Sequence, residues 1–401
     1  MLTSLGLVLL LGLAAGGLCR RLHLPTIIGM LFTGMVLGPF VLNLLDPSIL
    51  GISADLRKMA LVIILLKAGL SLNLSDLKKV GRPAVLMSCL PALCELSAFV
   101  LLAPALLGIT RLEGAVMGAV LAAVSPAVVI PRMVKLMESG RGTDQGIPQM
   151  IVAGASCDDV LVIVLFSTFL GMAQGGTADL AGLADIPVSI ILGILLGAVV
   201  GFVLAWSFED AYTAQRMVRN STKLVIVLGV AFLLVAVEDL LKGTVAVSGL
   251  LAVMSMACVL KMRCPASVGK RLSEKFGKLW IAAEVILFVL VGAAVDLQYT
   301  LTAGLPAVAM ILLALVFRSV GVLLCLLGTK LDRKERLFCV LAYLPKATVQ
   351  AAIGSVPLAV GLPCGKLVLS VAVLGILITA PLGAIAMDVS GEKLLKPGKP
   401  A

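Results

Sequence analysis

Long apolar stretches recur along nearly the whole chain, and they constrain its fold more than any other feature. Each is close to the roughly 20 apolar residues that a membrane-spanning helix needs. The thirteen stretches lie near residues 2–19, 26–45, 59–75, 83–107, 112–136, 147–174, 184–206, 221–238, 244–261, 279–296, 303–328, 336–361 and 365–388. With 60% hydrophobic and only 13% charged residues, a chain of 401 residues has too little polar surface for a soluble globule. We therefore expect an all-α polytopic membrane protein with about thirteen transmembrane helices.

The lysine and arginine residues between these stretches fall alternately on two sides of the expected membrane. One side holds 24 of them, from Arg20 to Lys399. The other side holds only five: Arg57, Lys58, Arg111, Lys242 and Lys366. Because cytoplasmic loops carry the excess of basic residues, we expect a multi-pass plasma-membrane protein with its N-terminus outside and its C-terminus in the cytoplasm. The net charge of +10 then indicates contact with anionic lipids and not with nucleic acid.

Two adjacent aspartates, Asp158 and Asp159, lie in the middle of the apolar stretch from Ile147 to Phe169. A helix that starts at Ile147 carries them about 17 Å into the bilayer at about 1.5 Å per residue. A carboxylate at that depth is costly unless it meets a cation, a proton or a water-filled cavity, so the pair marks an ion or proton pathway. Adjacent helical residues point about 100° apart, so the two carboxylates are expected to face different partners.

Two other interpretations of the aspartate pair fit less well. A helix-capping pair belongs at the start of a span, whereas Asp158 lies far inside the apolar stretch. An intramembrane aspartyl protease needs two aspartates that face each other and share a proton, and its Gly-x-Gly-Asp motif is absent from the sequence. We therefore do not expect an enzyme.

The fifth and twelfth spans contain helix breakers at mid-membrane depth. The fifth holds Pro126 and Pro131, and the twelfth holds Pro345. Proline removes a backbone donor and disfavours helix at the preceding residue, so each span is expected to break there, with an ordinary proline kink as the alternative. Because the two spans lie seven apart in order, they cross the membrane in opposite directions, as in an inverted repeat. At the breaks, Ser125 and Thr348 offer the hard oxygen ligands that suit an alkali cation.

A few other charged residues lie within the spans, among them three basic ones, Lys67, Arg318 and Lys346. Lys67 can extend along its own helix to the cytoplasmic face, which competes with a direct role in transport. Lys346 can offset the carbonyl ends of a helix at the break, or take part in transport directly. Arginine stays charged in proteins, so Arg318 is not a releasable proton carrier. Glu284 is interpreted as a helix-end carboxylate, with a functional role as the alternative.

Three segments carry a resemblance to a known family. They are Ala-Val-Ser-Pro-Ala-Val-Val-Ile-Pro at 123–131, Gly-Ile-Pro-Gln-Met-Ile-Val-Ala-Gly-Ala-Ser-Cys-Asp-Asp-Val at 146–160 and Leu-Pro-Lys-Ala-Thr-Val-Gln-Ala-Ala-Ile-Gly-Ser-Val at 344–356. With them the chain resembles the monovalent cation:proton antiporters, in particular their NHA branch. The resemblance covers nearly the whole chain and implies the sodium/proton antiporter fold, in which inverted repeats contribute two broken helices that cross.

The resemblance also implies roles for individual residues. Asp159 matches the main cation and proton site of the family, and Asp158 matches a neighbour that can share the titration. Arg318 stands where strongly electrogenic relatives have a lysine, and the NHA branch implies that this arginine pairs with Glu95. The arginine leaves the stoichiometry of exchange open.

The expected activity is exchange of sodium or lithium, with potassium as a further candidate, for protons. A proton and a metal ion compete for Asp159, and if the site crosses the membrane only when its charge is neutralised, the two gradients are coupled. No cofactor is needed. A sodium-coupled symporter of an organic solute on the same fold is the main alternative, and it requires a roomy pocket beside the crossing. A passive channel is a weaker alternative, because the sequence shows no repeated charged ring.

The expected domain organisation follows the inverted repeat. Spans 1–3 (residues 1–80) and spans 7–10 (181–300) form a scaffold that we expect to make a homodimer. Spans 4–6 (81–180) and spans 11–13 (301–390) form a core that moves as a rigid body, and 391–401 form a cytoplasmic tail.

The cysteines and the histidine give no metal or redox signal. The nine cysteines are scattered without a C-x-x-C pair, and most lie in apolar runs, as packing residues do. The only histidine, His23, lies in a short loop, so we expect a surface side chain and no ligand role.

Overall fold

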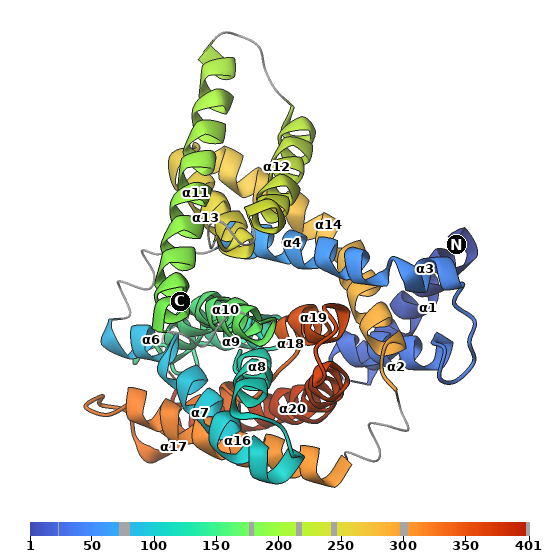
Figure 1. Cartoon of the computed structure of the whole chain (residues 1–401). Helices are drawn as coiled ribbons and strands as arrows, with labels where there is room; N and C mark the ends of the chain where they lie inside the picture. The colour runs from blue at the N-terminus through green and yellow to red at the C-terminus, as the bar shows by residue number, and fades with distance from the viewer. Residues whose placement is uncertain are drawn as a thin grey trace. The chain divides into compact units, whose positions relative to one another are not determined.

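The structure is a computed structural model, and it describes residues 1–22, 24–71, 81–175, 180–213, 219–241, 247–296 and 304–397. His23, Lys242 and Lys399, named in the sequence argument, lie outside the described residues. Helices account for nearly all regular structure (Figure 1). In the described ranges the one extended pairing is an isolated bridge between Arg141 and Pro397. The expected all-α class is confirmed.

The chain divides into two compact units, each described here by itself. The first comprises Met1–Ala54, Asn73–Ala173 and Leu287–Ala401, and the second Asp55–Leu72 and Gln174–Ile286. The helices of the first unit are α1 (Leu2–Arg21), α2 (Thr26–Leu37), α3 (Pro47–Gly51), α6 (Arg82–Met87), α7 (Leu90–Leu107), α8 (Arg111–Leu121), α9 (Pro126–Glu138), α10 (Ile147–Ala173), α16 (Gly304–Cys325), α17 (Arg333–Ala342), α18 (Thr348–Gly354), α19 (Val356–Ala359) and α20 (Gly365–Leu394). The second unit holds α11 (Leu180–Thr213), α12 (Asn220–Leu241), α13 (Gly249–Arg263), most of α4 (Ser53–Ser71) and the larger part of α14 (Ala266–Ala293).

Seven helical segments in the described ranges are long and apolar enough to cross a membrane. They are Leu2–Arg21, Arg82–Leu107, Ile191–Glu209, Asn220–Glu238, Ser267–Ala293, Gly304–Cys325 and Gly365–Leu394. The fifth and twelfth expected spans are missing from this set because each is divided into two short helices, α8 with α9 and α17 with α18. The total of thirteen spans stays a prediction.

Proline also explains two differences from the expected span boundaries. Helix α2 ends at Leu37, well before residue 45, because Pro39 follows Gly38 and disfavours helix there. The fourth span is interrupted between α6 and α7 at Ser88 and Cys89, directly before α7, whose first turn contains Pro91. A proline in the first turn lacks an amide that would be unsatisfied anyway, so it is well suited to the start of a helix.

Local sequence signals set the N-terminal ends of the two helices that lead into the breaks. Helix α8 begins with a capping box, in which Thr110 and Glu113 bind each other's backbone amides, and α17 begins with the same arrangement of Asp332 and Glu335. In the first unit α8 packs against α7, α10, α18 and α20 (Figure 1). Helix α8 therefore lies at the centre of the elements that carry the predicted site.

The second unit is built on the packing of α11 and α12 against α13. The backbones of α11 and α13 approach closely at Gly197, where a Cβ atom would lie 2.1 Å from the carbonyl oxygen of Ala252. Lys67 of α4 is half-buried, and its ammonium lies 5.7 Å from the ring centroid of Trp280 on α14, a cation–π contact. Glu284 is half-buried one turn further along α14.

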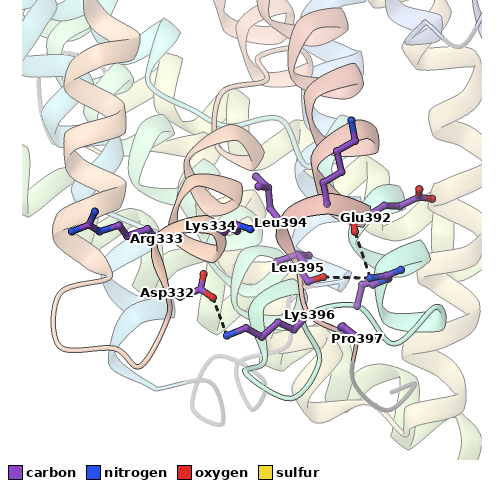
Figure 2. A pocket seen from close by; sticks show the side chains of 10 residues that line it. Asp332, Arg333, Lys334, Glu392, Leu394, Leu395, Lys396 and Pro397 are labelled. Carbon is purple, nitrogen blue, oxygen red and sulfur yellow. Dashed lines mark hydrogen bonds and ion pairs between the residues drawn. The ribbon is translucent and has the colours of Figure 1, made fainter.

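Hydrogen bonds and an ion pair hold the segment at the C-terminal end of α20 against two other segments of the first unit (Figure 2). The amide of Gly142 donates to the carbonyl of Lys396 at 2.9 Å, and the Lys396 ammonium lies 2.8 Å from Asp332, the N-cap of α17. A pocket of about 600 Å³ opens beside this contact. Its lining residues are Arg141, Asp332, Arg333, Lys334, Glu392, Lys393, Leu394, Leu395, Lys396 and Pro397.

Candidate functional site

At the break between α8 and α9, inside the first unit, four backbone groups are left without a helical hydrogen bond. They are the carbonyls of three consecutive residues and the amide of the next. Helix α8 ends at Leu121, and α9 begins at Pro126 after an extended Ser125. The carbonyls of Leu121, Ala122 and Ala123 have lost their helical partners, as the last carbonyls of any helix do. Such carbonyls carry the negative end of the helix dipole, so they attract cations and amide donors.

Buried side chains from other helices bind each of these groups. Lys346 Nζ donates to the carbonyl of Leu121 at 2.5 Å, and Arg318 Nη1 donates to the carbonyl of Ala122. Gln350 Nε2 donates to the carbonyl of Ala123 at 2.8 Å. The next group, the amide of Val124, donates to Asp158 Oδ2 at 2.7 Å. The break is thus held open by polar contacts, and it is more than a proline kink.

The second break, between α17 and α18, meets the first. The amide of Ser125 donates to the carbonyl of Pro345 at 2.8 Å. Within the second break, the amide of Lys346 donates to Thr379 Oγ1 of α20 at 2.9 Å. The amide of Ala347 donates to Gln350 Oε1 at 2.8 Å. Two segments more than 200 residues apart in sequence therefore share one polar centre.

Four fully buried charged side chains form a connected cluster at this centre. Arg318 Nη1 lies 2.8 Å from Glu95 Oε2, and Arg318 Nη2 lies 3.3 Å from Asp158 Oδ2. Lys346 Nζ lies 2.6 Å from Glu95 Oε1. The residues come from α7, α10, α16 and the second break. Two carboxylates face two cations, so the cluster is balanced in charge, and buried ions persist only with such partners.

Several buried oxygen atoms near the cluster lack a hydrogen-bond partner among the described residues, and three of them belong to predicted ligands. These three are Asp158 Oδ1, Asp159 Oδ1 and Ser125 Oγ. Asp159 as a whole is half-buried on α10, and it makes no ion pair with any residue in the described ranges. Thr348, the fourth predicted ligand, is buried at the first position of α18.

The structure brings several of the predicted site residues together. Arg318 forms an ion pair with Glu95, and Lys346 binds a helix carbonyl. Three contacts were not predicted from the sequence: Lys346 with Glu95, Arg318 with Asp158, and Gln350 with Ala123. A polar amide within an apolar run was a signal that could have pointed to Gln350.

No group of three or more histidine, cysteine, aspartate or glutamate residues suited to a resident metal ion occurs in the described part of the chain. The two breaks instead bring carboxylate, hydroxyl and backbone carbonyl oxygens together, and these are hard ligands.

Comparison with known proteins assigns the family. The sequence profile of the family described as "Sodium/hydrogen exchanger, transmembrane" matches residues 6–388. The chain belongs to this family. This family consists of exchangers and is not an enzyme family. None of the comparisons supports a sodium-coupled symporter.

Relatives of this sodium/hydrogen exchanger family member occur in mammals. The chain is 34% identical to sodium/hydrogen exchanger 9B2 of Homo sapiens over 384 residues, which cover 93% of this chain and 70% of the human protein. It is 32% identical to sodium/hydrogen exchanger 9B1 of Homo sapiens over 388 residues, covering 93% and 73%.

A solved structure confirms the fold of this family member. The chain is similar to the sodium proton antiporter MjNhaP1 from Methanocaldococcus jannaschii, with a TM-score of 0.80 and 25% sequence identity, and the match covers 98% of both chains. The sodium/proton antiporter fold that the sequence predicted is therefore present.

Proposed function

We propose that the protein exchanges a monovalent cation, sodium, lithium or potassium, for protons at Asp158 and Asp159. One observation carries the proposal. The four charges of Glu95, Asp158, Arg318 and Lys346 balance one another, whereas Asp159 stands outside the cluster with a buried oxygen that has no partner in the described part of the chain. An added carboxylate at this depth needs a cation or a proton to neutralise it.

Competition for Asp159 is then enough for exchange. A bound cation and a bound proton each remove the same negative charge, so each displaces the other. Moving the empty, charged carboxylate through a low-dielectric interior is costly, so the site changes sides only when it is loaded. The relatives are named for sodium and hydrogen exchange, which agrees with this pair of substrates.

Asp158 has a different role in this mechanism, because it is already held. Its Oδ2 accepts from the amide of Val124 and from Arg318, and only its Oδ1 is left for a cation. Ser125 and Thr348 would add neutral oxygens beside the two carboxylates. Arg318 keeps its charge throughout, so it carries none of the transported protons.

The proposed movement is alternating access of the core against the scaffold. The hydrogen bond from Ser125 to Pro345 and the contacts of Gln350 and Lys346 with α8 support movement of the two breaks as one body. The core would comprise residues 81–180 and 301–390. The scaffold, 1–80 and 181–300, would form the homodimer in a plasma membrane with anionic lipids, with the N-terminus outside and the C-terminus in the cytoplasm.

Transport by purified protein in proteoliposomes tests the proposal. With an imposed proton gradient, the wild type should show cation-dependent proton movement, and Asp159→Asn should abolish it. Asp158→Asn should weaken cation binding, since it removes one charged ligand and unbalances the cluster. Asp388→Asn, which changes an exposed carboxylate on α20, is the matched control and should behave as the wild type. Exchange by Asp159→Asn at the wild-type rate would disprove the assignment.

A further inference from the structure

Tyr343 is a large, fully buried side chain at the edge of the charge cluster, and the mechanism above does not use it. It follows the last residue of α17 and directly precedes the break that carries Lys346. A residue at this point connects the end of a helix to the polar centre, so its contacts can affect the geometry of that centre.

Tyr343 contacts Arg318 in two ways. Its backbone carbonyl accepts a hydrogen bond from Arg318 Nε at 2.5 Å. The Arg318 guanidinium carbon also lies 5.6 Å from the centroid of the Tyr343 ring, a cation–π contact. These contacts hold the guanidinium at Nε, while its two terminal nitrogens, Nη1 and Nη2, reach Glu95 and Asp158. The position of Tyr343 therefore determines how Arg318 meets the aspartate.

A glycine on α10 accommodates the other end of the tyrosine. A Cβ atom at Gly154 would lie only 2.1 Å from the Tyr343 hydroxyl, so only glycine leaves room for that oxygen. Among the residues that the structure describes, the hydroxyl has no hydrogen-bond partner. Gly154 precedes Asp158 by four residues, so both lie on the same face of α10. The tyrosine thus bridges Arg318 and the turn of α10 that carries the aspartate.

We propose that Tyr343 is a positioning residue of the ion site, seated in the opening that Gly154 leaves in α10, where it holds Arg318 against Asp158. It touches neither cation nor proton. By fixing Arg318, it fixes how much of the Asp158 charge is left for the cation, and so it sets cation affinity. This inference rests on the proposed function at Asp158 and Asp159.

The first test fills the opening. Gly154→Ala should push the phenol ring away from α10 and move Arg318 with it, raising the apparent KM for sodium about tenfold, the effect of one lost contact of about 1.4 kcal/mol. In protein that already carries Tyr343→Phe the oxygen is gone, and the new Cβ would meet the ring carbon at 3.4 Å, an ordinary contact. Met87 Cβ, at 3.0 Å, must then move by a few tenths of an ångström. The same alanine should therefore raise KM much less in that background.

A control and a second variant separate positioning from folding. Gly171→Ala, also on α10 but with open space around it, should leave KM and thermal stability unchanged. If Gly154→Ala does not fold, adding Tyr343→Phe should recover folded protein. Tyr343→Leu causes no clash at Gly154 but removes the ring beside Arg318, and it should also raise KM and shift the pH profile of transport. A purely structural role would lower only the amount of folded protein or the maximal rate.

The outcomes distinguish this inference from the proposed function. If Asp159→Asn abolishes exchange while Gly154→Ala and Tyr343→Leu keep the wild-type KM and pH profile, the positioning role is wrong and the site assignment stands. An equal effect of Gly154→Ala with and without Tyr343→Phe would also overturn the role of the opening. If Asp159→Asn exchanges normally, the proposed function itself fails.

Discussion

At the scale of single residues, Arg318 is the side chain on which the site depends most. Its guanidinium donates to Glu95, Asp158 and the carbonyls of Ala122 and Tyr343. A planar fork with five N–H donors can serve four acceptors at once, whereas a lysine ammonium has three donors at a single point. The two basic residues are therefore not interchangeable here.

We predict that Arg318→Lys lowers the free energy of unfolding by about 1.5–3 kcal/mol for each charged hydrogen bond that it fails to replace. Transport should fall with it, because Asp158 or Glu95 loses its partner. Thermal unfolding of the purified protein measures the first effect and proteoliposome transport the second. Arg132→Lys, at a partly exposed ion pair with Asp388, is the control and should change stability by less than about 1 kcal/mol. Wild-type stability in Arg318→Lys would show that fewer of these contacts form.

The pair of Glu95 and Arg318 should show strong coupling. Glu95→Gln alone leaves Arg318 and Lys346 with only Asp158 to balance them, and breaking a buried pair in this way costs about 3–5 kcal/mol. Adding Arg318→Met removes one excess charge, so the double variant should lose much less than the sum of the two single losses. Thermal unfolding of all four proteins gives the coupling energy. Purely additive losses would contradict an ion pair at this position.

Sequence alone supplied most members of the site but few of its contacts. Asp158, Asp159, Glu95, Arg318 and Lys346 stand out because charge is rare within an apolar span. Their partners depend on which helices are neighbours, which hydropathy does not contain. Tyr343 gave no signal for a related reason, since an aromatic residue in an apolar run looks like any core residue.

At the scale of the helical elements, the two breaks stabilise each other. Gln350 of α18 is the clearest link, because its side chain donates to the carbonyl of Ala123 in one break and accepts from the amide of Ala347 in the other. Both groups are buried backbone atoms, and each would lose a partner together with this side chain. A single fully buried amide thus satisfies an end of α8 and the beginning of α18.

We predict that Gln350→Met, which keeps the volume and removes the amide, lowers the free energy of unfolding by about 1–3 kcal/mol for each backbone group left unsatisfied. Thermal unfolding again provides the measurement. Gln145→Met makes the same change at an exposed position before α10 and should leave the unfolding temperature nearly unchanged. Equal losses in the two variants would mean that Gln350 does not join the breaks.

The prolines made the existence of the breaks predictable, because proline acts on its own backbone and on the residue before it. Helix α9 accordingly begins at Pro126, and Pro345 lies between α17 and α18. The interruption between α6 and α7 has the same cause at Pro91 but was not expected, since the apolar run continues through it. That the breaks meet is a property of packing, which only the resemblance to a known family had implied.

At the scale of the whole molecule, composition was enough for the class and the resemblance was needed for the fold. A long apolar chain with few charges cannot form a soluble globular fold, so the composition predicts a helical membrane protein. The division into two compact units was not predictable from composition. They join segments such as Met1–Ala54 and Leu287–Ala401 that hydropathy does not relate. The core and scaffold division remains a prediction about movement.

The ion pair between Lys396 and Asp332, which holds the segment after α20, is not expected to make transport depend on pH near neutrality. The Lys396 ammonium and the backbone amide of Glu335 lower the pKa of Asp332 below its usual 3.8, and Asp332 raises the pKa of Lys396 above its usual 10.5. The stabilisation from the aspartate is complete above pH 3.8 and is lost as the pH falls through its lowered pKa. The stabilisation from the lysine is complete below pH 10.5 and is lost as the pH rises through its raised pKa. Between these limits the ion pair is unchanged.

We therefore predict that docking of the C-terminal end is constant from about pH 5 to about pH 9, a window in which neither carboxylates nor lysines of ordinary pKa titrate. Hydrogen exchange of the Gly142 amide, which donates to the carbonyl of Lys396, measures docking once the intrinsic pH dependence of exchange is removed. Lys396→Gln should lower the protection of this amide equally at every pH in the window. Lys393→Gln, which removes the same charge from an exposed position one turn away, should leave protection unchanged. If transport varies with pH while this protection stays constant, the response arises outside the C-terminal contact, as the proposed exchange at the buried aspartates requires. Protection that falls between pH 6 and pH 8 would place a titrating group at the C-terminal contact instead.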